Sequence, residues 1–200
     1  MSAVTAAQSD PEQAAQALLR DFEAHFEVPD APPVPVDRIA ESLLGLLIEE
    51  CDDVRSIPGA PTDQGRLSGM IEPATRTIWL DRLECARSPG RRRFTIAHEC
   101  GHWVVHVVGD DAVCCRPQDI SEQQGAEARE LRRREAEANS FACELLMPEP
   151  LVHQHARLTG CNLAAMAARF DVSVPAIRLR LLTLGQLPPW MAAATSGGRS

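Results

Sequence analysis

The feature that most constrains this chain is a pair of histidines, His98 and His102, that stand four residues apart around Glu99. Apolar residues flank the segment on both sides, and the pattern predicts one helix over residues 91–108. Residues four apart lie on one face of a helix, so both imidazoles can reach one ion. The alternative is that these are only partly buried polar residues. A buried helix with two histidines and a glutamate needs partners for them, and this favours a metal site.

The position of Glu99 predicts a general base. It lies one residue round the helix from His98, beside the open coordination position of such a site. There a carboxylate can take a proton from a water whose pKa a zinc ion has lowered to roughly 7. Catalytic zinc takes three protein ligands, so a third is expected. His106 lies roughly 12 Å along the axis from His98, so we expect it to pack or hydrogen-bond nearby instead.

A second long helix, predicted over residues 126–146, offers carboxylates for the third position. Glu135 shares its face with Ala138 and Ala142, and small residues there allow two helices to pack closely. Asn139 lies four residues after Glu135 and is expected to hydrogen-bond a ligand. The alternative is a solvated charged face. Its members are Glu130, Arg132, Arg133, Arg134, Glu135 and Glu137.

Three stretches of the chain resemble the ImmA/IrrE family of metallopeptidases. Residues 93–102, RFTIAHECGH, are similar to the family's RFTIAHELGH helix. Residues 135–148, EAEANSFACELLMP, are similar to its ExxANxFAxxLLMP helix, and upstream Pro32–Val36 and Leu67–Gly69 resemble its PPVPV and LSG segments. The matches cover residues 32–148 in the family's order. The one departure in the first helix is Cys100, in place of an aliphatic residue.

The resemblance implies a gluzincin-like zinc site in which Glu135 is the third ligand, with Glu137 as the alternative. Manganese is a second candidate metal, because His/His/Glu sites accept several divalent ions. The resemblance also implies cleavage of a helix-turn-helix repressor, relieving transcription in a stress or mobile-element response. The chain contains no tyrosine, so Arg116 and His153 are the candidates for stabilising an oxyanion; each is also explained as a surface residue.

The rest of the pattern predicts an α+β protein. Strand candidates at residues 46–50, 67–72 and 77–80 predict a small antiparallel sheet that packs on the two helices. The predicted units are a zincin-like domain over residues 11–150 and a helical module over 151–187, with disordered tails at 1–10 and 188–200. The module resembles a helix-turn-helix, with Ser173 as an N-cap. Its second helix begins with apolar residues, which favours packing on the catalytic domain over DNA binding.

Composition excludes several classes of protein. The net charge of −8 argues against a protein that coats nucleic acid, and no apolar run is long enough to span a bilayer. The start of the chain lacks the features of a secretory signal, and the seven cysteines form no C-x-x-C pair, so we expect a cytoplasmic protein with reduced thiols. The sequence therefore predicts a zinc endopeptidase. The alternative is a catalytically silent, zinc-stabilised module that binds a regulator, and the oligomeric state is open.

Overall fold

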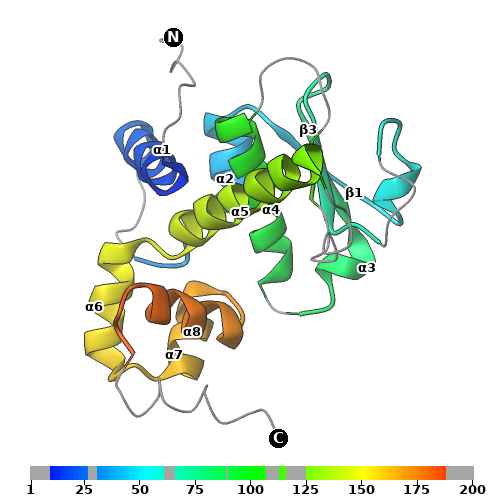
Figure 1. Cartoon of the computed structure of the whole chain (residues 1–200). Helices are drawn as coiled ribbons and strands as arrows, with labels where there is room; N and C mark the ends of the chain where they lie inside the picture. The colour runs from blue at the N-terminus through cyan, green and yellow to red at the C-terminus, as the bar shows by residue number, and fades with distance from the viewer. Residues whose placement is uncertain are drawn as a thin grey trace, which may run out of the picture.

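The computed structural model of the chain describes residues 10–26, 31–60, 66–88, 90–106 and 125–187, together with the backbone of residues 113–115 (Figure 1). The tails predicted to be disordered lie outside these ranges, except for Asp10. This residue caps the first helix, because its Oδ1 accepts a hydrogen bond from the Glu12 backbone N–H. Among the helices that the structure describes, none is long and apolar enough to cross a membrane.

The structure confirms an α+β fold built from short strands and mostly longer helices. In chain order, the described helices and helical turns are α1 (Pro11–His25), α2 (Val36–Arg38), the π-helical turn η1 (Ile39–Leu43), the 3-10 turn η2 (Val54–Ser56), α3 (Arg82–Cys85), α4 (Arg91–Gly101), the π-helical turn η3 (His102–His106), α5 (Ala126–Leu146), α6 (Glu149–Thr159), α7 (Leu163–Phe170) and α8 (Val174–Thr183). The strands are β1 (Leu47–Cys51), β2 (Gly69–Glu72), β3 (Thr77–Asp81) and β4 (Val113–Cys115).

The sheet is mixed, and the prediction of an antiparallel sheet was wrong for one strand. Its order is β1-β3-β2-β4. β2 is antiparallel to both of its neighbours, whereas β1 pairs with β3 in parallel, with Ile48 opposite Ile78. The short turn between β2 and β3 makes a hairpin, which forces those two strands to be antiparallel. β1 reaches β3 only after a long connection that includes β2, and such a crossover permits parallel pairing.

α4 packs against the sheet, α5 packs on α4, and α1 packs on α5 (Figure 1). One hydrophobic cluster joins these layers. Its fully buried members include Ile71 and Ile78 from the sheet, Ile96 from α4, Phe141 from α5 and Phe22 from α1. Burying a side chain of this size contributes roughly 1.5–3 kcal/mol. The core therefore fixes α4 and α5 against each other, and these are the two helices expected to carry the metal site.

The C-terminal helices pack on the same core, as predicted. Phe170 and Leu181 are fully buried members of the cluster. Arg93 on α4 donates to the Val34 carbonyl and pairs with Asp171, which ends α7 in the left-handed conformation. The segment 151–187, predicted to be helical, contains most of α6 together with α7 and α8. Ser173 caps α8, since its Oγ accepts a hydrogen bond from a backbone N–H in the first turn.

Candidate metal centre

α4 and the turn that follows it bring two imidazoles next to each other. His98 and His102 are both almost completely buried, and their Nε2 atoms lie 2.9 Å apart. Their rings meet edge to face, with centroids 4.6 Å apart. The four-residue spacing on one helix face brings this about, as the sequence indicates. Both Nε2 atoms therefore point at one spot in the interior.

α5 adds a carboxylate at that spot. Glu135 is buried, and its Oε2 lies 3.3 Å from His98 Nε2 while its Oε1 lies 3.5 Å from His102 Nε2. One ligand atom from each of these three residues lies within 4.8 Å of the others. Among the residues that the structure describes, this is the one such group of three or more metal-ligating side chains.

Small residues let α4 and α5 approach closely enough for this. A Cβ placed on Gly101 would lie 3.2 Å from the Ala138 Cα and 3.1 Å from a ring carbon of Phe141. Ala138 and Ala142 are fully buried at the contact, where the sequence predicts close packing. Larger side chains at these positions would push the helices apart, and Glu135 would move away from the histidines.

A second layer of contacts holds the outer nitrogens of both rings. His98 Nδ1 lies 3.0 Å from Asn139 Oδ1, the contact expected from the position of Asn139 on α5. A carbonyl oxygen only accepts, so Nδ1 of His98 carries the proton and Nε2 holds a lone pair. His102 Nδ1 lies 3.0 Å from His106 Nδ1. The Nε2 atoms of both rings are thus the atoms that face Glu135.

The alternative third ligand, Glu137, points elsewhere. Its Oε2 lies 2.9 Å from His106 Nε2, and its other oxygen accepts a hydrogen bond from Arg133. His106 therefore packs and hydrogen-bonds beside the site, as the sequence analysis expected. What the sequence analysis missed is that Glu137, His106 and His102 form a continuous chain. The signal was available in the spacing of four residues between His102 and His106.

Glu99 follows His98 on α4, and its carboxylate is fully buried. Its neighbour His98 is part of the cluster. The Glu99 side chain projects about 100° further round the helix than the side chain of His98. Of the two candidates for stabilising an oxyanion, Arg116 lies outside the described residues. His153 pairs with Glu149 on its own helix α6, so the structure does not bring it to the histidines.

The electrostatics of the cluster suit a cation. Burial lowers the pKa of His102 to about 4, so its imidazole is neutral near pH 7. Burial acts to raise the pKa of Glu135, but its contacts with His102 and His98 prevail and lower that pKa to about 2. The neutral imidazole of His102 and the ionised carboxylate of Glu135 are in the ligand states that a divalent metal requires.

The surroundings of one buried oxygen of Glu135 indicate whether these residues fit a metal ion. Glu135 Oε1 is buried and accepts no hydrogen bond from the residues that the structure describes. An ionised oxygen in that condition is costly unless a positive charge compensates it. The donor set of two imidazole nitrogens and one carboxylate oxygen matches catalytic zinc sites, which keep a further position open. The residues therefore fit a divalent metal ion.

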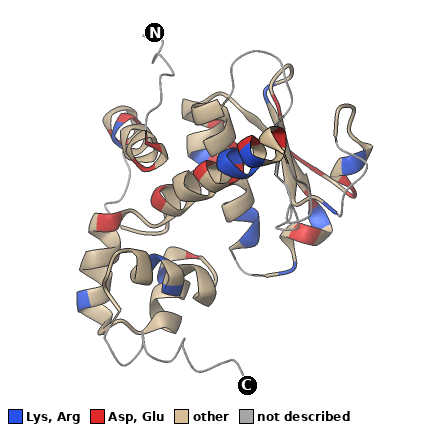
Figure 2. Cartoon of the chain, in the orientation of Figure 1, with Lys and Arg blue, Asp and Glu red and all other residues tan. Residues whose placement is uncertain are grey.

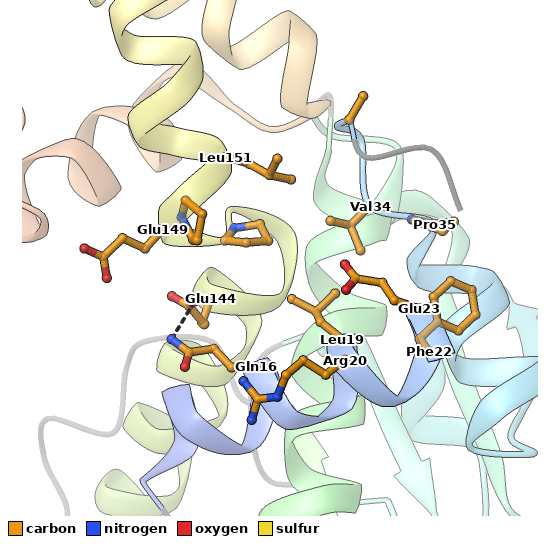
Figure 3. Close-up of a pocket in the computed structure, with 13 residues that line it drawn as sticks. Gln16, Leu19, Arg20, Phe22, Glu23, Val34, Pro35, Glu144, Glu149 and Leu151 are labelled. Carbon is orange, nitrogen blue, oxygen red and sulfur yellow. Dashed lines mark hydrogen bonds between the residues drawn. The ribbon is translucent and has the colours of Figure 1, made fainter. Parts of the chain in front are cut away.

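A separate cavity lies at the other end of α5 (Figure 3). Its volume is about 330 Å³, and α1, residues 31–35 and the junction of α5 with α6 line it. One of the charged groups that line it, the buried Glu144, already accepts a hydrogen bond from Gln16 Nε2 at 3.0 Å. Glu144 also pairs with the buried Arg180. The buried carboxylate of this cavity thus has a compensating charge, unlike Glu135 in the histidine cluster.

Comparison with known proteins agrees with this geometry. Residues 53–182 match a peptidase family whose description is IrrE N-terminal-like domain, and the match covers more than half of the chain. The chain belongs to this family. It is also 30% identical over 136 residues to the radiation response metalloprotease IrrE of Deinococcus radiodurans. That match covers 66% of this chain and 39% of the relative, so the chain spans well under half of that protein.

A solved structure shares the fold. A transcriptional regulator of Mycobacterium tuberculosis superposes with a TM-score of 0.57 at 21% identity, over 88% of this chain and 48% of that one. At this identity the likeness shows the fold alone. Membership of an IrrE-like metalloprotease family and the convergence of His98, His102 and Glu135 together support a divalent metal as the cofactor.

Proposed function

We propose that this chain is a zinc-dependent endopeptidase whose metal ligands are His98, His102 and Glu135. The observation that carries the proposal is the convergence of these three side chains, with ligand atoms within 4.8 Å of one another, and the residue after His98 on α4 is the fully buried Glu99. A bound zinc ion supplies a Lewis acid that polarises the scissile carbonyl and makes an attacking water more acidic. Manganese is the alternative metal.

The roles of the chain's own residues follow from their positions. Glu99 accepts the proton of the attacking water and delivers it to the leaving amine, as a general base and then acid. Asn139 keeps the proton of His98 on Nδ1 and so leaves Nε2 free. The burial of the cluster keeps the dielectric constant low, so that interactions between its charges are strong.

The substrate we propose is a protein, and specifically a helix-turn-helix transcriptional repressor whose cleavage serves a stress or mobile-element response. The family resemblance supports this, and one relative bears the name radiation response metalloprotease. We further propose a cytoplasmic protein that binds no nucleic acid directly. The net charge of −8 argues against nucleic-acid binding, as does the sparse basic charge on α7 and α8 (Figure 2). The division at residue 150 into a peptidase unit and a helical module stays a prediction.

The test combines metal content with cleavage. Wild-type protein supplied with zinc and freed of excess should hold about one zinc per chain, as one three-residue site requires, and Glu135→Ala should hold none. Wild type incubated with a cell extract should generate new protein N-termini, identified by mass spectrometry. Glu99→Gln should keep its zinc but generate about 10²- to 10⁴-fold fewer, since it lacks the general base.

Each outcome separates the proposal from its alternative. Wild-type protein that retains no metal would exclude the peptidase. Protein that retains zinc but produces no more N-termini than Glu99→Gln would favour the silent, zinc-stabilised module that binds a regulator.

A further inference from the structure

We propose that Glu137 and His106 are positioning residues that hold His102 in the one tautomer able to bind a metal. The proposal rests on the metal site proposed above. It assigns a role to a pair of residues that ligate nothing themselves, and it predicts that the metal affinity of this site depends on a carboxylate two contacts away from the ligand His102.

The contacts form an unbroken line from the surface to the ligand. Arg133 donates to Glu137 Oε1, Glu137 Oε2 lies 2.9 Å from His106 Nε2, and His106 Nδ1 lies 3.0 Å from His102 Nδ1. The His106 side chain is only 4% exposed, compared with 25% for Glu137 and 55% for Arg133. The line therefore runs from solvent into the buried cluster without a gap.

Counting protons along this line leaves one arrangement that allows ligation. A metal on His102 Nε2 requires that atom to hold a lone pair, so the ring proton must lie on Nδ1. Among the described residues, the one contact of His102 Nδ1 is with His106 Nδ1, which must then accept. Since a neutral imidazole has one N–H, the proton of His106 must lie on Nε2, and its acceptor there is Glu137.

His98 shows the same requirement met in a simpler way. Its Nδ1 faces the amide oxygen of Asn139, which cannot donate, so its tautomer is fixed directly. The partner of His102 is an imidazole, which can present either a donor or an acceptor at Nδ1. A carboxylate on the far side of His106 removes that ambiguity. Glu137 thus does for His102, through His106, what Asn139 does for His98.

The backbone is shaped for this contact. α4 ends at Gly101, and residues His102–His106 form the π-helical turn η3. The wider winding of such a turn changes how side chains four apart face each other, and π-turns within helices occur frequently at functional sites. Here the two rings lie with centroids 5.2 Å apart and tilted by 50°. The turn therefore places two imidazole nitrogens within hydrogen-bond distance.

The first experiment measures zinc affinity by competition with a chelator. Glu137→Ala should bind zinc about 10- to 100-fold more weakly than wild type, the usual cost of removing an outer partner of a metal ligand. The matched control is Glu130→Ala, because Glu130 also pairs with Arg133 on α5 but is hydrogen-bonded only to arginines in the described contacts. This control should bind zinc as wild type does. The double variant His106→Ala/Glu137→Ala should bind no more weakly than Glu137→Ala, because the two residues act as one unit.

For His106, the second experiment needs no metal. Nitrogen NMR of the imidazoles in the metal-free wild type reports which ring nitrogen carries the proton. We expect the proton on Nε2 in His106, where Glu137 accepts it, and we expect His106 to lose this preference in Glu137→Ala. Because His102 Nε2 also lies 2.9 Å from His98 Nε2, the tautomer of His102 is read in the zinc-loaded protein.

The outcomes separate this inference from the proposed function. Wild type that binds zinc while Glu137→Ala matches Glu130→Ala would overturn the positioning role and leave the peptidase proposal intact. Wild type that binds no zinc would end the peptidase proposal, and the metal-free protein would still show whether Glu137 fixes the tautomer of His106. A proton found on Nδ1 of His106 would overturn the inference in either case.

Discussion

α5 carries two buried carboxylates, and the protein treats them in opposite ways. Glu144 accepts a hydrogen bond from Gln16 on α1 (Figure 3). It also pairs with Arg180 on α8, which donates to the Met147 carbonyl. Glu135 faces two imidazoles, and within the described part of the chain one of its oxygens accepts no hydrogen bond. Described residues of the chain supply the partners of Glu144, whereas none of them gives Glu135 a permanent positive charge.

This difference separates a structural group from a binding group. Glu144 ties together the N-terminal helix, α5 and the C-terminal helices, so its contribution is present whenever the protein is folded. Glu135 contributes fully only when a cation completes its surroundings. Removing each carboxylate should therefore change different measurable quantities.

The largest effect should come from Glu144→Gln. This change leaves the Arg180 guanidinium buried without its counter-charge, and breaking a buried pair in this way costs about 3–5 kcal/mol. Denaturant unfolding should show that loss equally with zinc and with a chelator. The control is Glu130→Gln on the exposed face of α5, which should unfold close to wild type. If the two variants are equally stable, the comparison between the two carboxylates fails.

Glu135→Gln should give the opposite pattern. Without metal it should unfold within about 1 kcal/mol of wild type, because an amide can hydrogen-bond the histidines and no uncompensated charge remains. Zinc at 100 times its dissociation constant should stabilise wild type by about 2.7 kcal/mol, and it should not stabilise the variant. The measurement is thermal or denaturant unfolding with and without zinc. A variant that zinc stabilises as much as wild type would show that Glu135 is no ligand.

Variants of residues near the two carboxylates should show the same difference between zinc affinity and stability. Asn139→Ala removes the acceptor for His98 Nδ1 and should weaken zinc binding by about 10- to 100-fold, with little change in metal-free stability. Gln16→Ala removes a donor to Glu144 and should cost about 1 kcal/mol of stability with no change in zinc affinity. Chelator competition and denaturant unfolding on both variants check this. The same profile for both would contradict it.

The smallest effect should come from Gly101→Ala, at the contact between α4 and α5. The added methyl would lie 3.1–3.2 Å from Phe141 and Ala138, which forces a shift of a few tenths of an ångström. Alanine gains roughly 1 kcal/mol over glycine inside a helix, and this offsets part of the overpacking. Stability should therefore change little, while zinc affinity falls because Glu135 moves. Unchanged zinc affinity would mean that the close approach of the helices does not position the site.

The sequence predicts the histidine cluster well because its geometry is local. His98 and His102 share a helix face because they are four residues apart. On α5, Ala138 and Asn139 follow Glu135 by three and four residues, so they lie on its face of the helix. The bounds of α5, 126–146, were confirmed, since Pro148 marks its end. Each half of the site is encoded within a few turns of one helix. The resemblance to the family then pairs the two halves.

Features that depend on distant parts of the chain were not predicted. The parallel pairing of β1 with β3 depends on a crossover, and a strand pattern alone does not name its partner. The Glu144–Arg180 pair joins residues 36 apart, so no helical spacing indicates it. The predicted helix 91–108 also differs, because α4 changes to a π-helical turn at the second histidine. No composition rule marks such a turn.

That turn has a consequence for comparing this chain with others. A π-helical turn closes its hydrogen bonds over one residue more than an α-helical turn, so it is equivalent to a single-residue insertion in a regular helix. A homologue with a regular helix throughout would align with residues 102–106 only across a one-residue gap. An ungapped alignment would place a different side chain at His106, and the partner of His102 would be overlooked.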